Sequence, residues 1–587
     1  MADLGNYGGS DEENAEIKTL KQELLEKPDD FEIWEKLIRL CESLEGGLNR
    51  NSSPQALATL RDTYDAFLLK FPLLFGYWKK YADLEFNIAG PESAEMVYER
   101  GCASITNSVD LWTSYCAFKM DTTHTPQLVR ELFERAAEHV GLDFLAHPFW
   151  DKYIEYEERQ EAPENIFAIL KRVIHIPMHQ YARYYERLRQ LAHSRPLTEI
   201  ASPEELARFW QEVQDEARQH NVQKSDLELE RDVRTKIDTH FYQYFQATQV
   251  ETTKRWTYES EIKRPYFHVT ELEESQLANW RKYLDFESEQ DSNYARIVAL
   301  YERCLVTCAF YDEFWLRYAR WMSEQDDKEA EVRNIYLRAS TMFVPISRPA
   351  IRLQFALFEE KCERVGVAEE IYKGILGTLP DSIETVVAWA SMRRRQEGLD
   401  AAIDVLRTQI DSPDVDTYTK AAVAAEWATM LWEIKGAADE ARAIFTTNKQ
   451  WCADSRYFWQ KWFDFELAQP TDPSVEAETH ARIKNVYTEM RDRTRLPRNV
   501  KRALGINFLR FLYKRSGKDA AAEFLALDRE LNGPNPTAVT RKAGAEGTVA
   551  HGELDQDACL RAARTYVDFF QLHEEPNSNA TGVASFH

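Results

Sequence analysis

The chain has 587 residues and a formal net charge of −25, because 98 acidic residues outweigh 73 lysines and arginines. Hydrophobic residues make up 44% and aromatic residues 12% of the sequence, which excludes intrinsically disordered and collagen-like proteins. No run approaches the roughly 18 consecutive apolar residues of a transmembrane helix, and the acidic balance argues against binding polyanions over the whole surface.

The N-terminal residues 1–16 are rich in Gly, Asp and Glu, without the basic and apolar segments of a secretory signal. We expect them to form a short, disordered acidic tail. Eight cysteines are too few for a disulfide framework in a chain of this length. Reduced thiols in the cytosol or nucleus are therefore expected.

Tryptophan recurs at intervals of 32 to 38 residues in three runs: Trp78, Trp112 and Trp150, then Trp280 and Trp315, then Trp389, Trp427 and Trp459. A period of this length belongs to a supersecondary unit. Three of these tryptophans begin the pattern W-x2-Y-x3-E, in Trp78–Tyr81–Glu85, Trp150–Tyr153–Glu157 and Trp280–Tyr283–Glu287; weaker copies begin at Trp112, Trp315 and Trp459. Because offsets of 0, 3 and 7 share one side of an α-helix, each copy predicts a helix with an aromatic face.

A second pattern follows about fifteen to twenty residues later, with helical spacing around it. It is an aromatic residue, then Glu-Arg and a small residue, as in Tyr98-Glu99-Arg100-Gly101, Phe133-Glu134-Arg135-Ala136 and Tyr301-Glu302-Arg303-Cys304. The repeating unit is therefore predicted to be an antiparallel helical hairpin whose second helix offers a small residue where the backbones approach. About ten first helices are expected, near Trp34, Trp78, Trp112, Trp150, Trp280, Trp315, Phe355, Trp389, Trp427 and Trp459.

One hairpin cannot bury both faces alone, so the fold class is predicted to be all-α, a superhelical solenoid of stacked hairpins in two blocks. The residues expected in the repeat core are Trp78, Tyr81, Tyr98, Trp112, Phe133, Trp150, Tyr153, Trp280, Tyr283, Tyr301, Trp315 and Tyr318. The expected organisation is a tail (1–16), an N-terminal block (17–195), bracing helices or a hinge (196–265), a C-terminal block (266–532), and a second tail (533–587) with one candidate docking helix near residues 555–572.

The two patterns together resemble the HAT (half-a-TPR) repeat. Longer segments are similar to the pre-mRNA-processing factor 39 family, namely Phe71-Pro-Leu-Leu-Phe-Gly-Tyr-Trp78-Lys-Lys-Tyr81, His147-Pro-Phe-Trp150-Asp-Lys-Tyr153, Arg264-Pro-Tyr-Phe-His-Val269 and Leu277-Ala-Asn-Trp280-Arg-Lys-Tyr283-Leu-Asp-Phe-Glu287. The resemblance covers roughly residues 30–530.

This resemblance implies a nuclear scaffold in pre-mRNA splicing that belongs to the U1 snRNP and supports 5′ splice-site recognition. It also implies contacts with U1 proteins, including the U1-specific C protein. Dimerisation through the C-terminal block is implied as well, as a homodimer or with a related HAT protein. The alternative is a HAT scaffold of another RNA-processing complex, of the 3′-end cleavage or crooked-neck type.

Catalysis, cofactors and metals are not expected. The sequence contains none of the common phosphate-loop, dinucleotide, zinc-protease or nucleophile-elbow motifs. His175 and His179 are four residues apart, but Pro177 between them disturbs the helix that would aim both rings at one metal. Cys304 and Cys308 fit buried thiols better than metal ligands. An enzyme subunit of the prenyltransferase α-chain type remains a third class, which nothing here favours.

The sequence also predicts the surroundings of two sets of charged residues. The motif glutamates Glu85, Glu157 and Glu287 are expected to pair with arginines of their own hairpins, such as Arg100 and Arg303, and to add little stability. Between residues 482 and 515 there are eleven Lys and Arg but only two acidic residues. The dense centre of this cluster consists of Arg491, Arg493, Arg495, Arg498, Lys501 and Arg502. It indicates either a contact with RNA phosphate or an acidic protein, or a solvated face that complements acidic neighbours in the array. A milder basic patch spans residues 171–195.

Overall fold

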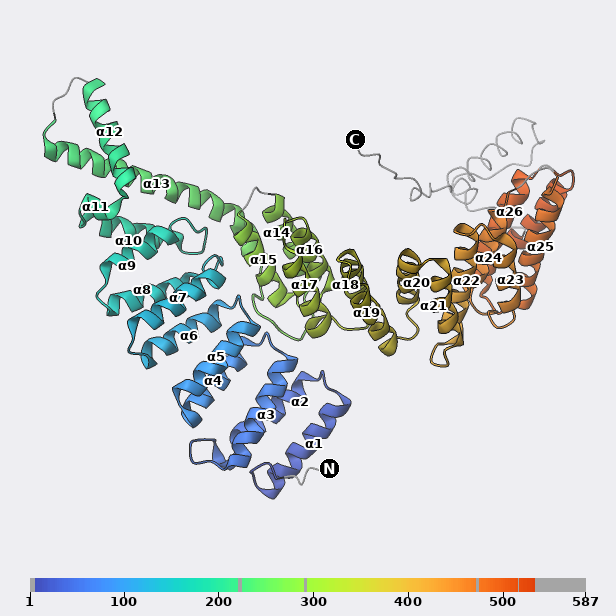
Figure 1. Ribbon diagram of the computed structural model, residues 1–587, viewed down its shortest axis with the longest axis horizontal. Helices are drawn as coiled ribbons and strands as arrows, with labels where there is room; N and C mark the ends of the chain where they lie inside the picture. Colours follow the sequence, from blue (N-terminus) through green and yellow to red (C-terminus); the bar gives the residue numbers. More distant parts are fainter. Residues whose placement is uncertain (1–5, 220–223, 290–292, 471–473, 516, 534–587) are drawn as a thin grey trace, which may run out of the picture. The chain divides into compact units, whose positions relative to one another are not determined.

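The computed structural model describes residues 6–219, 224–289, 293–470, 474–515 and 517–533. Every regular element among these residues is helical and none is a strand, which confirms the predicted all-α fold (Figure 1). The chain divides into two compact units, residues 1–351 and 352–587. The division falls inside the block expected over residues 266–532, after its second hairpin. No helix of the described part is both long and apolar enough to cross a membrane.

The first unit contains six of the predicted hairpins. They are α2 (Phe31–Ser43) with α3 (Pro54–Lys70), α4 (Phe75–Ala89) with α5 (Pro91–Ser104), α6 (Val109–Thr122) with α7 (Pro126–Val140), α8 (His147–Arg159) with α9 (Pro163–Val173), α14 (Glu274–Glu289) with α15 (Tyr294–Thr307), and α16 (Asp312–Ser323) with α17 (Glu329–Arg338). A π-helical turn, Ala339–Phe343, continues α17. All six begin where a recurring Trp predicts a first helix.

The second unit contains the other four predicted hairpins and one further helix pair. They are α18 (Ala350–Lys361) with α19 (Val365–Thr378), α20 (Ile383–Glu397) with α21 (Leu399–Asp411), α22 (Thr417–Glu433) with α23 (Ala438–Asn448), α24 (Arg456–Leu467) with α25 (Glu476–Arg493), and finally α26 (Arg498–Lys514) with α27 (Ala520–Asn532). The last pair lacks the Trp signature, which is why the periodicity does not predict it as a hairpin.

In two hairpins, a single glycine separates the first helix from the second. Gly90 separates α4 from α5 with a φ of +100°, and its N–H donates to the carbonyls of Glu85 and Phe86. Gly398 separates α20 from α21 with a φ of +104°. Because L-residues with a side chain rarely adopt such φ values, glycine allows one helix to follow the other without a loop.

The N-terminal residues differ from the expected tail. Helix α1 (Asp11–Glu26) begins inside the stretch predicted to be disordered, and Ser10 and Glu13 form a capping box at its start. Acidic residues in a first turn favour a helix N-terminus rather than disorder. Buried Ile17 and Leu20 then pack α1 against α2. The prediction of disorder was wrong because it relied on the acidic composition and missed this amphipathic helix.

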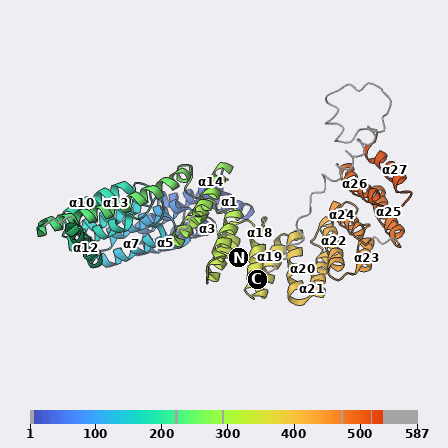
Figure 2. The ribbon, with the colours of Figure 1, turned by 90° about the horizontal axis from the view of Figure 1, so that it is seen from above.

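The segment between the blocks is helical and anchored at several points. It consists of α10 (Tyr181–His193), α11 (Leu197–Ile200), α12 (Pro203–Gln219) and the 34-residue α13 (Asp226–Glu259). Helix α13 packs on α10, α12 and α14, and Figure 2 shows it beside α10 and α12. Arg234 donates to the carbonyls of Ala192 and Arg195, and the Thr248 hydroxyl donates to that of Ile174 at 2.6 Å. Thus α13 connects the fourth hairpin to the fifth. The candidate docking helix near residues 555–572 lies outside the described residues.

Candidate functional site: a polar ladder, a buried ionic junction and a basic turn

The aromatic motif residues lie in the interior of the array. All twelve residues expected in the repeat core are at most 5% exposed. Their polar atoms have regular partners: the indole N–H of Trp78 donates to the carbonyl of Pro72, and that of Trp315 to the carbonyl of Ala309. Such buried Trp and Tyr groups require hydrogen-bond partners, and six-residue spacing supplies them from the preceding loop.

At several hairpin boundaries, the aromatic residue of the preceding helix stacks on the motif tyrosine of the next hairpin. The ring centroids of Phe133 and Tyr153 are 4.5 Å apart with an interplanar angle of 3°. The pairs Tyr98–Tyr115, Tyr258–Tyr283 and Tyr301–Tyr318 repeat this arrangement at 4.7 to 5.1 Å. The two sequence patterns therefore meet across hairpin boundaries.

The motif glutamates pair with the preceding hairpin and not with their own, so that expectation was wrong. Glu157 on α8 accepts from Arg130 on α7 at 2.8 and 2.9 Å. Three further pairs repeat this geometry: Arg61–Glu85, Arg255–Glu287 and Arg442–Glu466. These four carboxylates are buried, whereas the expectation assumed exposed pairs. The reason is geometric, since the glutamate seven residues after the motif tryptophan faces the helix stacked before it.

The boundary between the second and third hairpins shows the same contact with its charges exchanged. Seven residues after Trp112, the position of the motif glutamate is held by Lys119 on α6, which pairs with Glu95 on α5. Glu95 lies three residues before the aromatic residue Tyr98, the position at which α3, α7, α13 and α23 carry arginine. This exchange indicates that an opposite-charge pair, rather than one residue type, satisfies the position.

The Glu-Arg pair of the second helices forms a further contact between successive hairpins. Arg135 on α7 donates to Glu99 on α5 at 2.5 Å, the Tyr115 hydroxyl donates to the same carboxylate at 2.6 Å, and the guanidinium lies 5.4 Å from the Trp112 ring centroid. Equivalent arginine–acid contacts are Arg100–Asp65, Arg172–Glu134, Arg303–Glu259 and Arg338–Glu302. We call these contacts, together with the four buried pairs and Lys119–Glu95, the polar ladder.

The end of α13 takes part in the polar ladder as if it were a second helix. Arg255, Tyr258 and Glu259 have the spacing R-x2-aromatic-acid that Arg61, Tyr64 and Asp65 show on α3, and that recurs on α7 as Arg130, Phe133 and Glu134. This spacing is the sequence signal that could have predicted how α13 joins the fifth hairpin. Stacking of Tyr258 on Tyr283 and pairing of Arg255 with Glu287 complete the contact.

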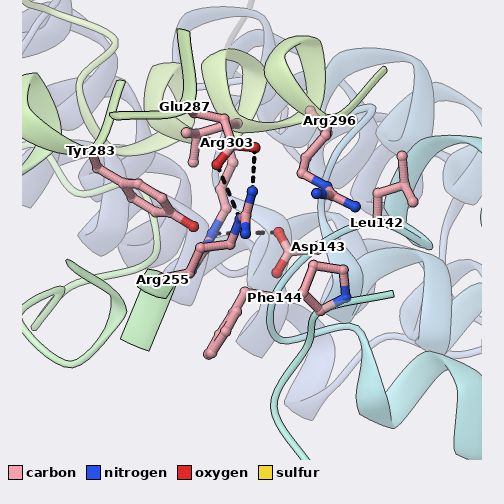
Figure 3. Close-up of a pocket in the computed structure, with 11 residues that line it drawn as sticks. Leu142, Asp143, Phe144, Arg255, Tyr283, Glu287, Arg296 and Arg303 are labelled. Carbon is pink, nitrogen blue, oxygen red and sulfur yellow. Dashed lines mark hydrogen bonds and ion pairs between the residues drawn. The ribbon is translucent and has the colours of Figure 1, made fainter. Parts of the chain in front are cut away.

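A buried ionic junction lies where α13, α14 and α15 meet the loop between α7 and α8. We define it as Asp143, Arg255, Glu259, Glu287 and Arg303; Figure 3 shows four of these residues converging. Arg303 donates to Glu259 at 2.6 and 2.8 Å, and its Nε lies 3.4 Å from Asp143. Through Asp143, the fifth hairpin is joined to the N-terminal hairpins more than a hundred residues earlier in the chain.

Burial governs the charges of the junction. Burial raises the pKa of Asp143 above its usual 3.8, although the neighbouring Arg303 opposes this shift. For Arg303, burial alone would lower the pKa, but Asp143 and Glu259 outweigh it and raise the pKa. A cavity lined by junction residues has a volume of about 30 Å³, which is room for about one water molecule. The junction therefore suits a structural connection.

The basic cluster of residues 482–515 separates into internal and exposed members. Arg491 pairs with Glu530, Lys501 donates to the carbonyls of Arg491 and Thr494, and Arg502 donates to Asn532. Arg493, Arg495 and Arg498 are exposed and lie together where α25 passes into α26; we call these three the basic turn.

The two histidines considered as metal ligands lie in different surroundings, and arginines of the 171–195 patch form ion pairs. His175 lies against Tyr244, whereas His179 stacks on Trp256, so the two imidazoles have different surroundings. Within the described residues, no group of three His, Cys, Asp or Glu side chains is arranged to hold a metal ion. In the 171–195 patch, Arg172, Arg183 and Arg187 pair with acidic residues of earlier helices: Glu134, Asp151 and Glu158.

Known proteins resemble this chain in both blocks. The family model "PRP39 N-terminal HAT repeat" matches residues 18–190, and "PRP39 C-terminal HAT repeat" matches residues 253–395. Pre-mRNA-processing factor 39 of Schizosaccharomyces pombe is 49% identical over 534 residues, which cover 89% of this chain and 87% of that protein.

Two more distant relatives align over shorter stretches. Human pre-mRNA-processing factor 39 is 31% identical over 410 residues, covering 65% of this chain and 58% of that protein. The U1 small nuclear ribonucleoprotein component PRP42 of Saccharomyces cerevisiae is 25% identical over 330 residues, covering 55% of this chain and 59% of that protein. The two family models and the alignment along most of the fission yeast protein show that this chain belongs to the pre-mRNA-processing factor 39 family of HAT-repeat proteins.

Proposed function

We propose that this protein is a non-catalytic scaffold in pre-mRNA splicing that acts in the nucleus as part of the U1 snRNP. Membership of the pre-mRNA-processing factor 39 family supports the role in pre-mRNA processing. The relative PRP42 is named as a U1 small nuclear ribonucleoprotein component, which supports the assignment to that particle. The family match also favours this function over a HAT scaffold of a 3′-end cleavage or crooked-neck complex.

The polar ladder is the structural observation that carries the proposal. Its carboxylates, guanidiniums and tyrosine hydroxyls are the groups that acid–base catalysis would need, and they are bonded to one another between hairpins. A stacked array held in this way presents long helical surfaces, which is how repeat proteins bind several partners at once. The protein accordingly organises other molecules and does not transform one.

The finer roles belong to the same proposal. We infer that the scaffold supports 5′ splice-site recognition by contacting U1 proteins, including the U1-specific C protein. We infer that it also dimerises through the C-terminal block, with itself or a related HAT protein.

Affinity capture of the tagged full chain from nuclear extract, followed by mass spectrometry, tests the assignment. U1 proteins are expected in the eluate, and they should remain after nuclease treatment because the scaffold holds them by protein contacts. Recovery of 3′-end cleavage factors without U1 proteins would reject the proposal in favour of the alternative complex.

Light scattering of the purified chain at micromolar concentration tests self-association. A homodimer has twice the 68.5 kDa mass of one chain. A single-chain mass would reject the homodimer. Mixing with a related HAT protein then tests the heterodimer, which requires the summed mass of both chains.

A further inference from the structure

The arginines of the basic turn are paired less closely than those of the polar ladder. Most arginines of the polar ladder lie within 3 Å of a carboxylate, and Arg491 and Lys501 of the same cluster are bonded internally. In contrast, Arg493 and Arg495 approach their nearest carboxylates only to 3.9 and 3.8 Å, and their side chains are 74% and 85% exposed. Distances of this size are too long for hydrogen bonds, so the two guanidiniums keep their donors available.

Arg498 shares this exposure and occupies an unfavourable position. It is the first residue of α26, and the structure gives it no ion pair among the described residues. A cation at a helix N-terminus is opposed by the helix dipole and by the unpaired N–H groups there. Its own helix therefore does not account for this arginine, whereas an anionic ligand at the turn would satisfy both the side chain and the helix end.

The backbone of the basic turn is held firmly in place. Between the arginines, Leu496 is buried, and Pro497 fixes the start of α26. The ammonium group of Lys501 donates to the carbonyls of Arg491 and Thr494 at 2.7 and 2.8 Å, which closes the end of α25. A pre-ordered turn reduces the entropy lost when a ligand binds its side chains.

An exposed tryptophan lies in the neighbouring turn, between α23 and α24. Lys449 in this turn donates to both oxygens of Glu489 on α25 at 2.8 Å, and Asp454 is the carboxylate nearest Arg495. These contacts place the turn that carries Trp451 next to the end of α25 and Arg495. Its indole N–H donates to Asn448, yet 36% of the residue is exposed.

We propose that the basic turn and Trp451 form a binding site for single-stranded RNA, in which the arginines contact phosphates and the indole stacks on a base. Guanidiniums that contact the backbone, combined with an aromatic stacking platform, are the two features by which proteins bind single strands without sequence preference. The exposed indole favours RNA over an acidic peptide, which has no base to stack.

The net charge of −25 does not prevent such a site. At physiological ionic strength the Debye length is about 8 Å, so the acidic surface elsewhere is screened from a phosphate at the basic turn. This RNA-binding site does not depend on the proposed scaffold function, because that function rests on contacts with protein partners.

Fluorescence anisotropy of a labelled twelve-nucleotide oligouridylate, titrated with the full-length chain, measures RNA affinity and tests the site. The variant R493E/R495E/R498E should bind about 10-fold or more weakly, and the slope of log affinity against log salt should fall by about 2, for three lost phosphate contacts at about 0.7 each. The milder R493Q/R495Q/R498Q should show the same direction. The variant R39E/R208E/R218E is a matched control, since it makes the same charge change at exposed arginines of the first unit that also lie near one acidic residue each.

Replacement of the indole separates stacking from charge. Trp451→Ala should weaken oligouridylate binding about 10-fold while leaving the salt slope unchanged, because a stacked base contributes without releasing counterions. Equal losses in the basic-turn variant and the R39E/R208E/R218E control would overturn the proposal. So would unchanged RNA binding in the basic-turn variant, or tight binding of a polyglutamate peptide at this turn with no binding of the oligouridylate.

Discussion

Glu157 on α8 accepts hydrogen bonds at 2.8 and 2.9 Å from Arg130 on α7, which precedes it by 27 residues, and the carboxylate is fully buried. Asn165 on α9 donates to the same carboxylate at 2.8 Å. One side chain therefore joins the second helix of one hairpin to both helices of the next. Repeated along the array, this contact makes the stability of each hairpin depend on its predecessor, as nearest-neighbour coupling in repeat proteins requires.

Removing the charge of Glu157 should destabilise this part of the array. Glu157→Gln should lower the free energy of unfolding by about 2–3 kcal/mol, because it leaves the Arg130 guanidinium without its counter-ion; the partial exposure of Arg130 keeps the loss below that for a fully buried pair. Urea unfolding of the full chain measures it. The adjacent Glu158→Gln is a matched control, expected to change stability by less than about 0.5 kcal/mol, since Glu158 pairs with Arg187 at the surface. Equal effects at the two positions would contradict this role of Glu157.

Charge exchange at the boundary of the second and third hairpins provides a reciprocal test. Lys119→Glu alone should destabilise the protein by about 1–2 kcal/mol, because it places a third carboxylate beside Glu95 and Glu99. Adding Glu95→Arg should restore most of the loss by recreating the Arg–Glu arrangement found at Arg130 and Glu157. A double-mutant cycle by thermal denaturation measures the coupling, and a coupling near zero would show that the pair is incidental.

The two acidic partners of Arg303 should differ sharply in importance. Glu259→Gln removes the carboxylate that receives two hydrogen bonds from a buried guanidinium, and a loss of about 3 kcal/mol or more is expected. Asp143→Asn removes a buried charge 3.4 Å from Arg303 whose desolvation is incompletely compensated, so a change within about 1 kcal/mol is expected. Denaturant unfolding of both variants decides whether this order holds; the reverse order would place the main anchor at Asp143.

The raised pKa of Asp143 also predicts a pH dependence. Between the usual pKa of 3.8 and the raised native value, the folded protein holds this proton while the unfolded chain has released it. The contribution of Asp143 to the free energy of unfolding therefore falls as pH rises through that range. Asp143→Asn lacks this contribution, so its stability relative to the wild type should increase as the pH is raised. Thermal melts of both proteins at several pH values from 4 upward measure the difference, and a relative stability that decreases with pH would contradict the assignment.

Two helical glycines should respond oppositely to a larger side chain. A Cβ on Gly101 of α5 would lie 3.1 Å from Trp78 and 3.1 Å from Leu111, so Gly101→Val should cost about 2 kcal/mol through overpacking. A Cβ on Gly374 of α19 would meet nothing within 4 Å. Gly374→Ala should stabilise the protein by about 0.5–1 kcal/mol through helix propensity. Differential scanning calorimetry of the two variants tests whether the small residue is required only where hairpins approach.

The sequence predicts the hairpins well because their cores are repeated. Large aromatic residues at a recurring interval mark all ten first helices, nine by a Trp and one by Phe355, and no tertiary information is needed to place them. The small residue expected where backbones approach is Gly101, against the ring of Trp78. In contrast, the pair α26–α27 packs through Phe508, Leu512 and Leu527 without a tryptophan, so periodicity alone does not mark it.

Partners across hairpin boundaries were harder to predict. Spacing shows that Glu157 shares a face with Trp150 and Tyr153, but it does not show which neighbouring helix covers that face. The division at residues 351 and 352 and the contact between Asp143 and Arg303 also depend on how distant hairpins meet. For the basic turn, sequence clustering identified the region, but only burial and hydrogen bonding separate Arg493 from the internally bonded Lys501.

Hydrogen exchange of the full-length wild type and Glu157→Gln tests the coupling between hairpins most directly. The polar ladder predicts faster amide exchange in α6 and α7 as well as in α8 and α9, because the lost contact spans both hairpins, with exchange in the second unit unchanged. The Glu158→Gln control should match the wild type throughout. Faster exchange confined to α8 and α9, with α6 and α7 as protected as in the wild type, would contradict the claim that these contacts bind the array together.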